Sequence, residues 1–285
     1  MPPRSNPTAR QERLGVELRK LREATGLSAR EAGEALGGGQ PQISNIESGR
    51  YGVSEERVRR LAELYACDDT ALVDALCAMV DEVRGKKGWW EEYRGILPDG
   101  FLDLAELEHH ATHLCAYQIS HIPGVFQTEA HIRALFAYAA TPLPPDDLDT
   151  RVAHRLRRSA VIDPGSATEF EAIIHEAAFR MRFGGRAVAR AQLEHILDLS
   201  ERDNVTVRVI TFEADGFAGS GNAMMYAGGA VPQLDTVQFD SVHGSVFLDA
   251  REQLERYRFI LDRMRAVSLP EDETRIFIRS LAHDV

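Results

Sequence analysis

The chain has 285 residues, which is enough for two domains that each bury a core of their own. Its three cysteines show no paired spacing, and no run approaches the roughly 18 apolar residues that a membrane-spanning helix needs. These features exclude a disulfide scaffold and a membrane span, so we expect a cytoplasmic protein without membrane association.

The charge is distributed unevenly along the chain. Residues 1–66 contain 11 Lys and Arg against 9 Asp and Glu, a net charge of +2. Because the whole chain has a net charge of −11, residues 67–285 carry −13. The basic surplus is small, so we expect weak non-specific binding to nucleic acid that decreases steeply with salt. The arginines expected to contact phosphate are Arg4, Arg10, Arg13, Arg30 and Arg50.

The first predicted helix follows a short polar segment. Residues 1–9 are rich in Pro and Ser, and we expect them to be disordered. Apolar residues on one stripe, Leu14, Leu18 and Leu21, then predict an amphipathic helix over residues 10–24 that ends before Gly26.

Two short helices joined by a tight turn are predicted between Ser28 and Arg50. Ser28 and Glu31 form a capping box, and three glycines at 37–39 stop the helix that it starts. The next helix has Gly39 or Gln40 as its cap, a proline in its first turn, and an end near Gly49. The apolar face expected for the first helix of the pair consists of Ala32, Ala35 and Leu36.

The second helix of the pair has two different faces. Ile43, Ile46 and Glu47 share one face, and the opposite face is short, polar and uncharged. Amide side chains suit bidentate hydrogen bonding to base edges, so this polar face is interpreted as a DNA-contacting surface. The alternative interpretation is a polar face that is only solvated. The residues expected at DNA are Ser28, Arg30, Gln40, Pro41, Gln42, Ser44, Asn45, Ser48 and Arg50.

The segment from Ser28 to Arg50 resembles the helix-turn-helix of the phage-repressor type, the XRE family. The family pattern Ser-x-x-Glu-x-Ala/Gly-x-x-Leu-Gly-x-x-Gln-x-x-Ile-Ser-x-Ile-Glu-x-Gly-Arg aligns here without a gap. The resemblance implies an ion pair between Arg22 and Glu47 and a sequence-specific transcriptional regulator. One short helix reads only a few base pairs, so we expect a homodimer on a palindromic double-stranded DNA operator.

Two further helices complete a five-helix domain predicted over residues 1–84. Ser54 caps the fourth helix, which runs to Tyr65, and residues 67–84 form the fifth. Residues 85–100 are predicted to be a linker, with a composition break at Gly85-Lys86-Lys87-Gly88. Trp89 and Trp90 follow this break, and at least one of them is expected to anchor the linker onto the second domain, with ligand contact as the alternative.

The remaining chain resembles actinobacterial XRE-type regulators with a C-terminal domain of unknown function, often called antitoxin-like. The matching segments include Trp89-Trp90-x-x-Tyr93, Ile122-Pro123-Gly124-Val125-Phe126-Gln127-Thr128, His175-Glu176-Ala177-Ala178-Phe179-Arg180, Asn204-Val205-Thr206-Val207 and Gly244-Ser245-Val246-Phe247-Leu248-Asp249. The resemblance implies control by a small partner protein encoded nearby, as in an antitoxin-like or developmental switch.

An α+β fold is predicted for residues 101–285, because helices come first, strands follow and helices return. Asp249 and Glu252 are expected to form a capping box. The predicted helices are 101–114, 128–139, 145–160, 186–202, 250–267 and 270–281. The predicted strands are 169–174, 205–210, 223–226, 236–239 and 245–248.

Candidate chemistry in this region is sparse. His109 and His113 are spaced one helical turn apart, but neither a His-Glu-x-x-His motif nor a completing Cys or Asp accompanies them. The glycine-rich stretch Gly216–Gly221 lacks the Lys-Ser/Thr of a phosphate loop and is expected to be a loop, or else a flap over a pocket. We therefore expect no metal, no cofactor and no enzymatic activity.

Three arginines on one predicted helix face, Arg151, Arg155 and Arg158, are interpreted as ion-pairing residues, with an anionic ligand or partner as the alternative. A rival to partner-protein control is a small-molecule effector in a pocket between the domains, lined by Trp89, Trp90 and the Ile122–Gln127 loop. A third hypothesis is a catalytic second domain that uses His175 or Glu176. The candidate effector or partner surface comprises Trp89, Trp90, Pro123, Gln127, Arg151 and Arg155.

Overall fold

A computed structural model describes residues 7–85, 88–138, 142–219, 221–241 and 244–285. The chain divides into two compact units, an N-terminal unit of residues 1–107 and a C-terminal unit of residues 108–285, and each is described by itself. Arg4 and the Lys86-Lys87 break lie outside the described residues.

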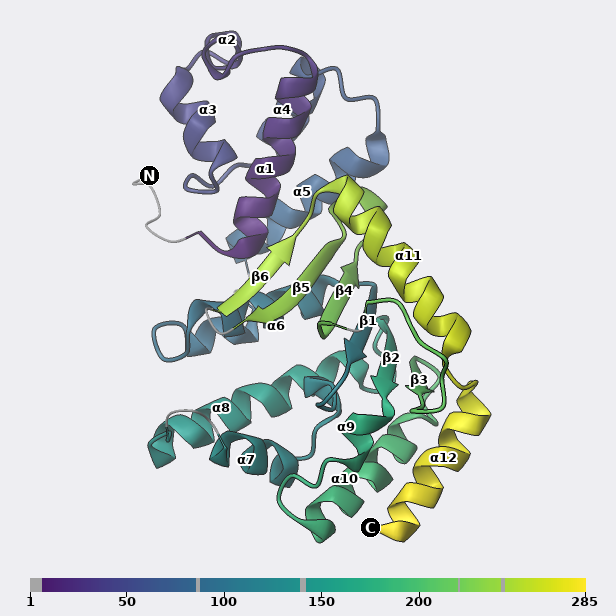
Figure 1. The fold of residues 1–285 in the computed structure, drawn as a ribbon. Helices are drawn as coiled ribbons and strands as arrows, with labels where there is room; N and C mark the ends of the chain where they lie inside the picture. Colours follow the sequence, from purple (N-terminus) through teal and green to yellow (C-terminus); the bar gives the residue numbers. More distant parts are fainter. Residues whose placement is uncertain (1–6, 86–87, 139–141, 220, 242–243) are drawn as a thin grey trace. The chain divides into compact units, whose positions relative to one another are not determined.

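Short helices with identifiable caps build the N-terminal unit (Figure 1). Thr8 and Gln11 form a capping box at the start of the first helix, so the expected disorder is wrong for residues 7–9. The core receives Leu18, Ile43, Leu61 and Leu76 from four different helices, each at most 1% exposed. These helices are α1 (Ala9–Ala24), α2 (Ala29–Ala35), α3 (Gln40–Glu47), α4 (Glu55–Leu64) and α5 (Thr70–Gly85).

The tryptophan pair lies in a short 3₁₀ helix, η1 (Trp89–Tyr93), which precedes α6 (Asp99–His110). Trp90 is 4% exposed and packs with Leu97 and Leu102, whereas Trp89 is partly exposed beside it. The first half of α6 also meets α1, because the Ala9 amide donates to Asp103 Oδ1 at 3.1 Å. These contacts explain why the compact unit extends to Leu107, beyond the boundary predicted at residue 100.

The helix predicted to reach Leu114 ends at His110, and the chain continues as strand β1 (His113–Gln118). The four middle residues of β1 are all buried, so this central strand has an unbroken apolar run instead of the alternation that identifies half-buried strands. His113 therefore does not lie one helical turn from His109, and its ring stacks on Tyr226 at 6.1 Å. Among the described residues, no group of three or more His, Cys, Asp or Glu could hold a metal ion.

The C-terminal unit is organised around a mixed sheet, with the strand order β3-β2-β1-β4-β5-β6 among the described residues. Strands β1, β2 and β3 are parallel, and β4, β5 and β6 continue the sheet in antiparallel pairs. The helices between the parallel strands are crossovers, which the α+β prediction lacked because β1 was missed. The further strands are β2 (Glu169–His175), β3 (Val205–Ile210), β4 (Met224–Gly228), β5 (Thr236–Ser241) and β6 (Gly244–Leu248).

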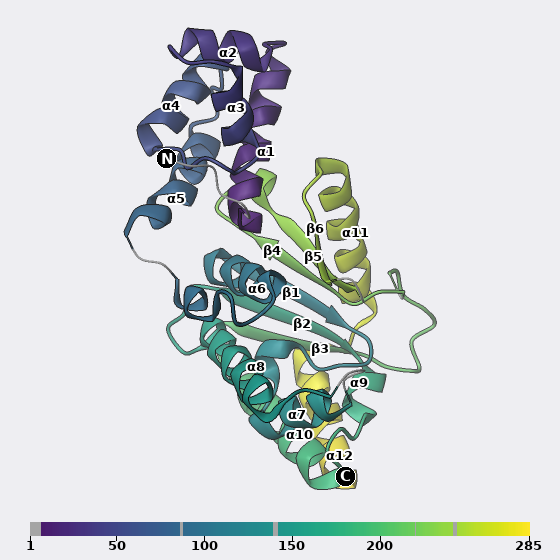
Figure 2. The ribbon, with the colours of Figure 1, turned by 90° about the vertical axis from the view of Figure 1, so that its left-hand side faces the viewer.

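Helices cover both faces of this sheet. Figure 2 shows α7, α8 and α10 together on one side of the parallel strands. On the other face, Leu254, Leu261 and Met264 of α11 pack against Tyr117 and Ile173. The helices are α7 (Glu129–Ala137), α8 (Pro145–Arg158), α9 (Glu176–Arg180), α10 (Arg186–Leu199), α11 (Arg251–Val267) and α12 (Glu271–Asp284), with 3₁₀ turns η2 (Gly124–Phe126), η3 (Ser159–Ile162) and η4 (Pro232–Leu234).

The capping box expected at the start of α11 is not formed. The N-cap residue is Ala250, not Asp249, and no side chain makes a cap hydrogen bond there. The short helix α9 was not predicted, and its cap is unusual, because His175 Nδ1 accepts the Ala177 amide at 3.2 Å. Within the part of the chain that the structure describes, no helix has both the length and the apolar character needed to span a membrane.

Buried histidines, of which His131 is one, are expected to make the stability of the C-terminal unit sensitive to acid. His131 of α7 is 2% exposed, neither ring nitrogen has a hydrogen-bond partner, and its ring meets Phe183 edge-on at 5.7 Å. Burial, reinforced by His121 and Arg155, lowers the pKa of His131 from 6.5 to about 4.

His131→Leu is therefore expected to reduce the loss of stability in acid. The unfolded chain binds a proton at this imidazole below about pH 6.5 and the folded chain only below about pH 4, so stability falls as the pH drops through this window. Between pH 8 and pH 5 the expected contribution of His131 is about 2 kcal/mol. Urea unfolding at both pH values measures it, and an unchanged pH 8 to pH 5 difference in the variant would contradict the assignment.

Candidate nucleic-acid interface

Helix α2 begins at a capping box and ends at glycines. The Glu31 amide donates to Ser28 Oγ at 3.2 Å, and the Ser28 amide donates to Glu31 Oε2 at 2.8 Å, which confirms the capping box. Gly37 has a φ of +71° and carries the chain out of α2. The buried residues of α2 are Ala32 and Gly33; Ala35 is exposed, so its expected burial is wrong, and Leu36 is half-buried.

Two helical glycines set the distances between these helices. A Cβ at Gly33 would lie 2.6 Å from the carbonyl carbon of Gly39, and a Cβ at Gly15 would lie 2.5 Å from the carbonyl oxygen of Glu47. The start of α3 thus approaches α2, and its end approaches α1, at distances that only glycine permits. Neither residue was predicted to have this role, although a glycine inside a predicted helix costs about 1 kcal/mol and indicates such an approach.

A buried ion pair holds the end of α3 against α1. Arg22 Nε donates to Glu47 Oε1 at 2.6 Å, and Nη2 donates to Oε2 at 2.9 Å. The remaining Arg22 nitrogen, Nη1, donates to the Leu27 carbonyl at 2.7 Å, and both side chains are 9% exposed. The bond to Glu47 raises the pKa of Arg22. A bidentate pair of this kind fixes the rotation of α3 about its axis as well as its distance from α1.

The opposite side of α3 is open to solvent. Ile43 and Ile46 are 1% and 5% exposed on the inner side, whereas no residue expected at base edges is buried. The N-cap of α3, Gly39, provides no side-chain hydrogen bond to the first-turn amides. The exposed residues are Gln40, Pro41, Ser44, Ser48 and Arg50, and the partly exposed ones are Gln42 and Asn45.

The arginines expected at phosphates have different surroundings. Arg50 is exposed and makes no ion pair with any described residue, whereas the exposed Arg30 is paired with Glu34 at 2.9 Å. Arg13 is 8% exposed and lies 3.3 Å from Glu17, so its expected phosphate contact is wrong. Arg10 is partly exposed and lies near Glu106, and burial raises the pKa of that carboxyl to about 7. Arg50 is therefore the freest cation among the described arginines of this set.

The residues of the candidate effector surface fall in both units. Trp90 is buried within the N-terminal unit, and Pro123 and Gln127 are buried within the C-terminal unit. Gln127 Nε2 donates to the Ile122 carbonyl at 2.7 Å, and its Oε1 accepts from Arg155 Nη1 at 3.0 Å.

The arginine stripe on α8 is partly internal. Burial lowers the pKa of Arg155 to about 10, and its guanidinium lies 4.7 Å above the Phe136 ring. Arg158 forms an ion pair with the buried Glu108, while Arg151 is partly exposed. The Ile122–Gln127 loop and two of the three arginines therefore act as internal supports of the C-terminal unit.

The residues proposed for a catalytic second domain also make structural bonds. Glu176 is 5% exposed; its Oε1 accepts from Arg180 Nε at 2.6 Å, and its Oε2 accepts from the Phe212 amide at 2.9 Å. His175 uses Nδ1 to cap α9. Both side chains thus hold the end of β2 and the start of α9 in place.

These features define the class of the N-terminal region. Residues 13–76 match the model of a helix-turn-helix domain, which supports a DNA-binding regulator of that class. Residues 101–280, more than half of the chain, match the model described as a domain of unknown function, DUF5753, and the chain belongs to that family. No curated protein and no solved structure matches the chain.

Proposed function

We propose that the protein is a sequence-specific DNA-binding transcriptional regulator of the XRE type in which α3 enters the major groove. The observation that carries this proposal is the outer face of α3, an uncharged surface of amides and hydroxyls on a helix held by Gly15 and by the Arg22–Glu47 pair. A major groove about 12 Å wide admits one helix, and amide side chains can distinguish its base edges.

The roles on this face follow from position. Gln42 and Asn45 present amides that suit adenine, and Pro41 offers an apolar surface to a thymine methyl. Arg50, just beyond the helix, suits a phosphate. Ser28 is committed to its capping box, so any phosphate contact that it makes is secondary.

Asn45→Ala and Arg50→Ala are expected to weaken DNA binding in different ways. Loss of Asn45 removes a base contact, which costs about 1–3 kcal/mol and relaxes preference at one operator position. Loss of Arg50 removes a phosphate contact, so it weakens binding to all sequences and lowers the salt slope by about one. An operator selected from random DNA by the full chain, and its single-base variants, serve as ligands in anisotropy titrations at several salt concentrations.

A matched control is Arg190→Ala, which removes an exposed arginine of the C-terminal unit that is paired with Glu194. This variant should retain the affinity, the base preference and the salt slope of the wild type. An equal loss on every sequence for Asn45→Ala would contradict base reading by α3.

We further propose that the regulator acts as a homodimer on two half-sites of a palindrome. The reading face of α3 is short and uncharged, so one copy offers few contacts, and half-sites one helical turn apart, about 34–36 Å, would double them. Large apolar side chains exposed on the C-terminal unit, Phe259 and Ile276 at 64% each, are candidate contacts for a second copy. A monomer that binds one half-site tightly would contradict this proposal.

For the regulatory signal we propose a small partner protein encoded nearby, in an antitoxin-like or developmental switch of actinobacterial type. This proposal is supported by the resemblance of the C-terminal unit to the C-terminal domain of actinobacterial XRE-type regulators. The apolar side chains exposed on this unit also support it. A non-enzymatic role agrees with the structural bonds of His175 and Glu176. Purification of the tagged full chain from cells, followed by a test of whether a recovered partner releases DNA, would examine this proposal; the alternative is a small-molecule effector.

A further inference from the structure

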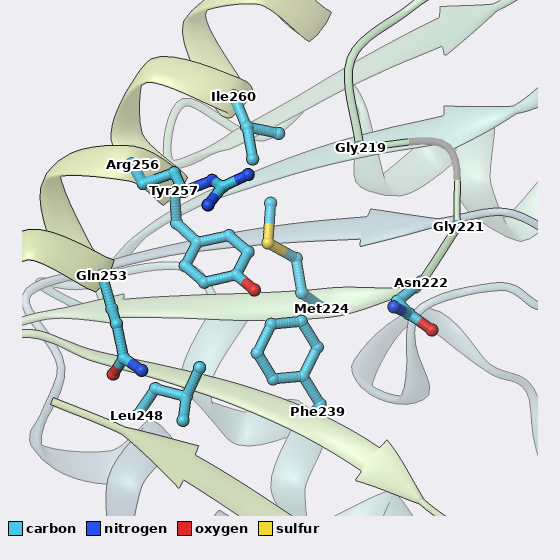
Figure 3. A pocket seen from close by; sticks show the side chains of 10 residues that line it. All are labelled: Gly219, Gly221, Asn222, Met224, Phe239, Leu248, Gln253, Arg256, Tyr257 and Ile260. Carbon is cyan, nitrogen blue, oxygen red and sulfur yellow. The ribbon is translucent and has the colours of Figure 1, made fainter. Parts of the chain in front are cut away.

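The C-terminal unit contains a cavity of about 400 Å³. It lies between α11, the strands β4, β5 and β6, and the loop that precedes β4 (Figure 3). Neither Trp89, Trp90 nor the Ile122–Gln127 loop lines it, whereas Gly219 and Gly221 of the glycine-rich stretch do. The lining residues are Gly219, Gly221, Asn222, Met224, Phe239, Leu248, Gln253, Arg256, Tyr257 and Ile260.

The inner part of the cavity is apolar and partly aromatic. Met224 of β4 is 4% exposed, and the rings of Phe239 and Tyr257 lie 5.2 Å apart at an angle of 59°. Leu248 and Ile260 continue this surface from β6 and α11. Aromatic rings and a thioether form a surface on which a flat or branched apolar group packs well.

The loop before β4 contacts α11 beside the cavity. Gly219 has a φ of +71°, and a Cβ there would lie 2.8 Å from Ile260 Cγ2 and from Met264 Cε. The loop backbone therefore packs directly on the helix, and the two elements together form one wall of the cavity (Figure 3).

The polar side of the cavity carries one positive charge. Arg256, Gln253 and Asn222 are exposed, and none of them makes a hydrogen bond or an ion pair with a described residue. The guanidinium of Arg256 points toward the space between Ile260 and Met224 (Figure 3). Among the described residues, no Asp or Glu lines the cavity.

Three other arginines of α11 have carboxylate or hydroxyl partners. Arg251 donates to Glu255 at 2.9 Å, Arg265 donates to Glu171 at 2.8 Å, and Arg258 donates to Tyr226 Oη at 2.5 Å. Arg256 is thus a cation without a counter-charge at the edge of an apolar hollow. This combination is complementary to a molecule with an apolar body and an anionic group.

We propose that this cavity binds a small organic anion, a carboxylate or sulfonate carried on an aromatic or branched apolar body. The apolar body occupies the space between Met224, Phe239 and Tyr257, and the anionic group pairs with Arg256. The volume lies within the range of about 300–1,000 Å³ that small-molecule sites occupy. The site goes beyond the proposed DNA-binding function and does not depend on it.

The test is isothermal titration calorimetry of the full chain with 1-naphthoate and with 1-naphthylmethanol, which share an aromatic body and differ in charge. The wild type should bind naphthoate saturably and more tightly than the alcohol. Arg256→Gln should weaken naphthoate about tenfold, the effect of losing one charge-assisted bond, and leave the alcohol unchanged. Leu248→Trp, which fills the cavity, should abolish binding of both compounds.

Arg263→Gln is the matched control, because Arg263 is an exposed residue of α11 that does not line the cavity. It should bind naphthoate as the wild type does. Absence of saturable naphthoate binding up to millimolar concentration, or equal affinity of the wild type and Arg256→Gln, would overturn the proposal. Operator binding by the same preparations separates the two ideas, since a chain that binds DNA but not naphthoate contradicts this inference alone.

Discussion

Replacing Glu47 with alanine is expected to lower the free energy of unfolding of the N-terminal unit by about 3–5 kcal/mol. The substitution leaves the Arg22 guanidinium, 9% exposed, without the carboxylate that accepts two of its hydrogen bonds. The Leu27 carbonyl remains as a partner but carries no charge. Removal of one member of a buried pair costs far more than the pair contributes, because the remaining charge stays desolvated.

Operator binding should be lost along with stability, since α3 depends on this pair for its position. At any temperature where the N-terminal unit melts, the affinity for every DNA sequence should fall by the same factor. Asn45→Ala, by contrast, is expected to lose preference at one operator position. Thermal and urea unfolding followed by circular dichroism measure the effect on stability, and anisotropy titrations at low temperature measure the effect on binding.

The matched control is Glu34→Ala, which breaks the exposed Arg30–Glu34 pair and should change stability by less than about 1 kcal/mol. A double variant, Arg22→Met with Glu47→Leu, should recover part of the loss because it leaves no buried charge. A stability loss for Glu47→Ala no larger than that of Glu34→Ala would contradict a buried, structurally required pair.

The second large effect is expected in the C-terminal unit for Glu108→Ala. Glu108 is 2% exposed and accepts two bonds from Arg158, at 2.6 and 2.7 Å. Its removal leaves the buried Arg158 guanidinium without the carboxylate that accepts both bonds, close to Arg155, whose pKa is lowered by burial and further by repulsion from Arg158. We expect a loss of about 3–5 kcal/mol in the free energy of unfolding.

The Ile122–Gln127 loop should respond first. A Cβ on Gly124 would lie 3.5 Å from the Arg158 nitrogens, so the loop rests on this guanidinium. Hydrogen exchange of residues 122–127 should therefore accelerate in Glu108→Ala before global unfolding. Glu194→Ala, which breaks the exposed Arg190–Glu194 pair, is the control, and unchanged protection of the loop would contradict this support.

Local signals in the sequence predict the helix pair α2 and α3 well. The Ser28 capping box and the turn after it depend on residues within a few positions of one another, so they can be recognised without a fold. The same holds for Ser54, which caps α4, and for the β-branched runs of β2 and β3. The outer face of α3 follows from helical period alone, because within the described part of the chain none of its side chains has a hydrogen-bond partner on another element.

Other features depend on distant parts of the chain and could not be predicted. Strand β1 pairs with β2 and β4 and is covered on both faces, so its sequence lacks alternation. The burial of Gln127 depends on Arg155, 28 positions away. The cavity depends on α11 crossing strands that precede it in the chain.

The sequence by itself determined that this chain carries a capped helix pair with a polar, uncharged outer face, because capping, turn conformation and helical period are local properties. Only the tertiary structure decided how that face is held and what lies in the rest of the chain. The contact of Gly15 with the Glu47 carbonyl, the parallel half of the sheet and the unpaired Arg256 beside an apolar cavity all result from packing between residues far apart in sequence. Such packing depends on how apolar surface and charge are buried over the whole fold, so it cannot be inferred from a local sequence pattern.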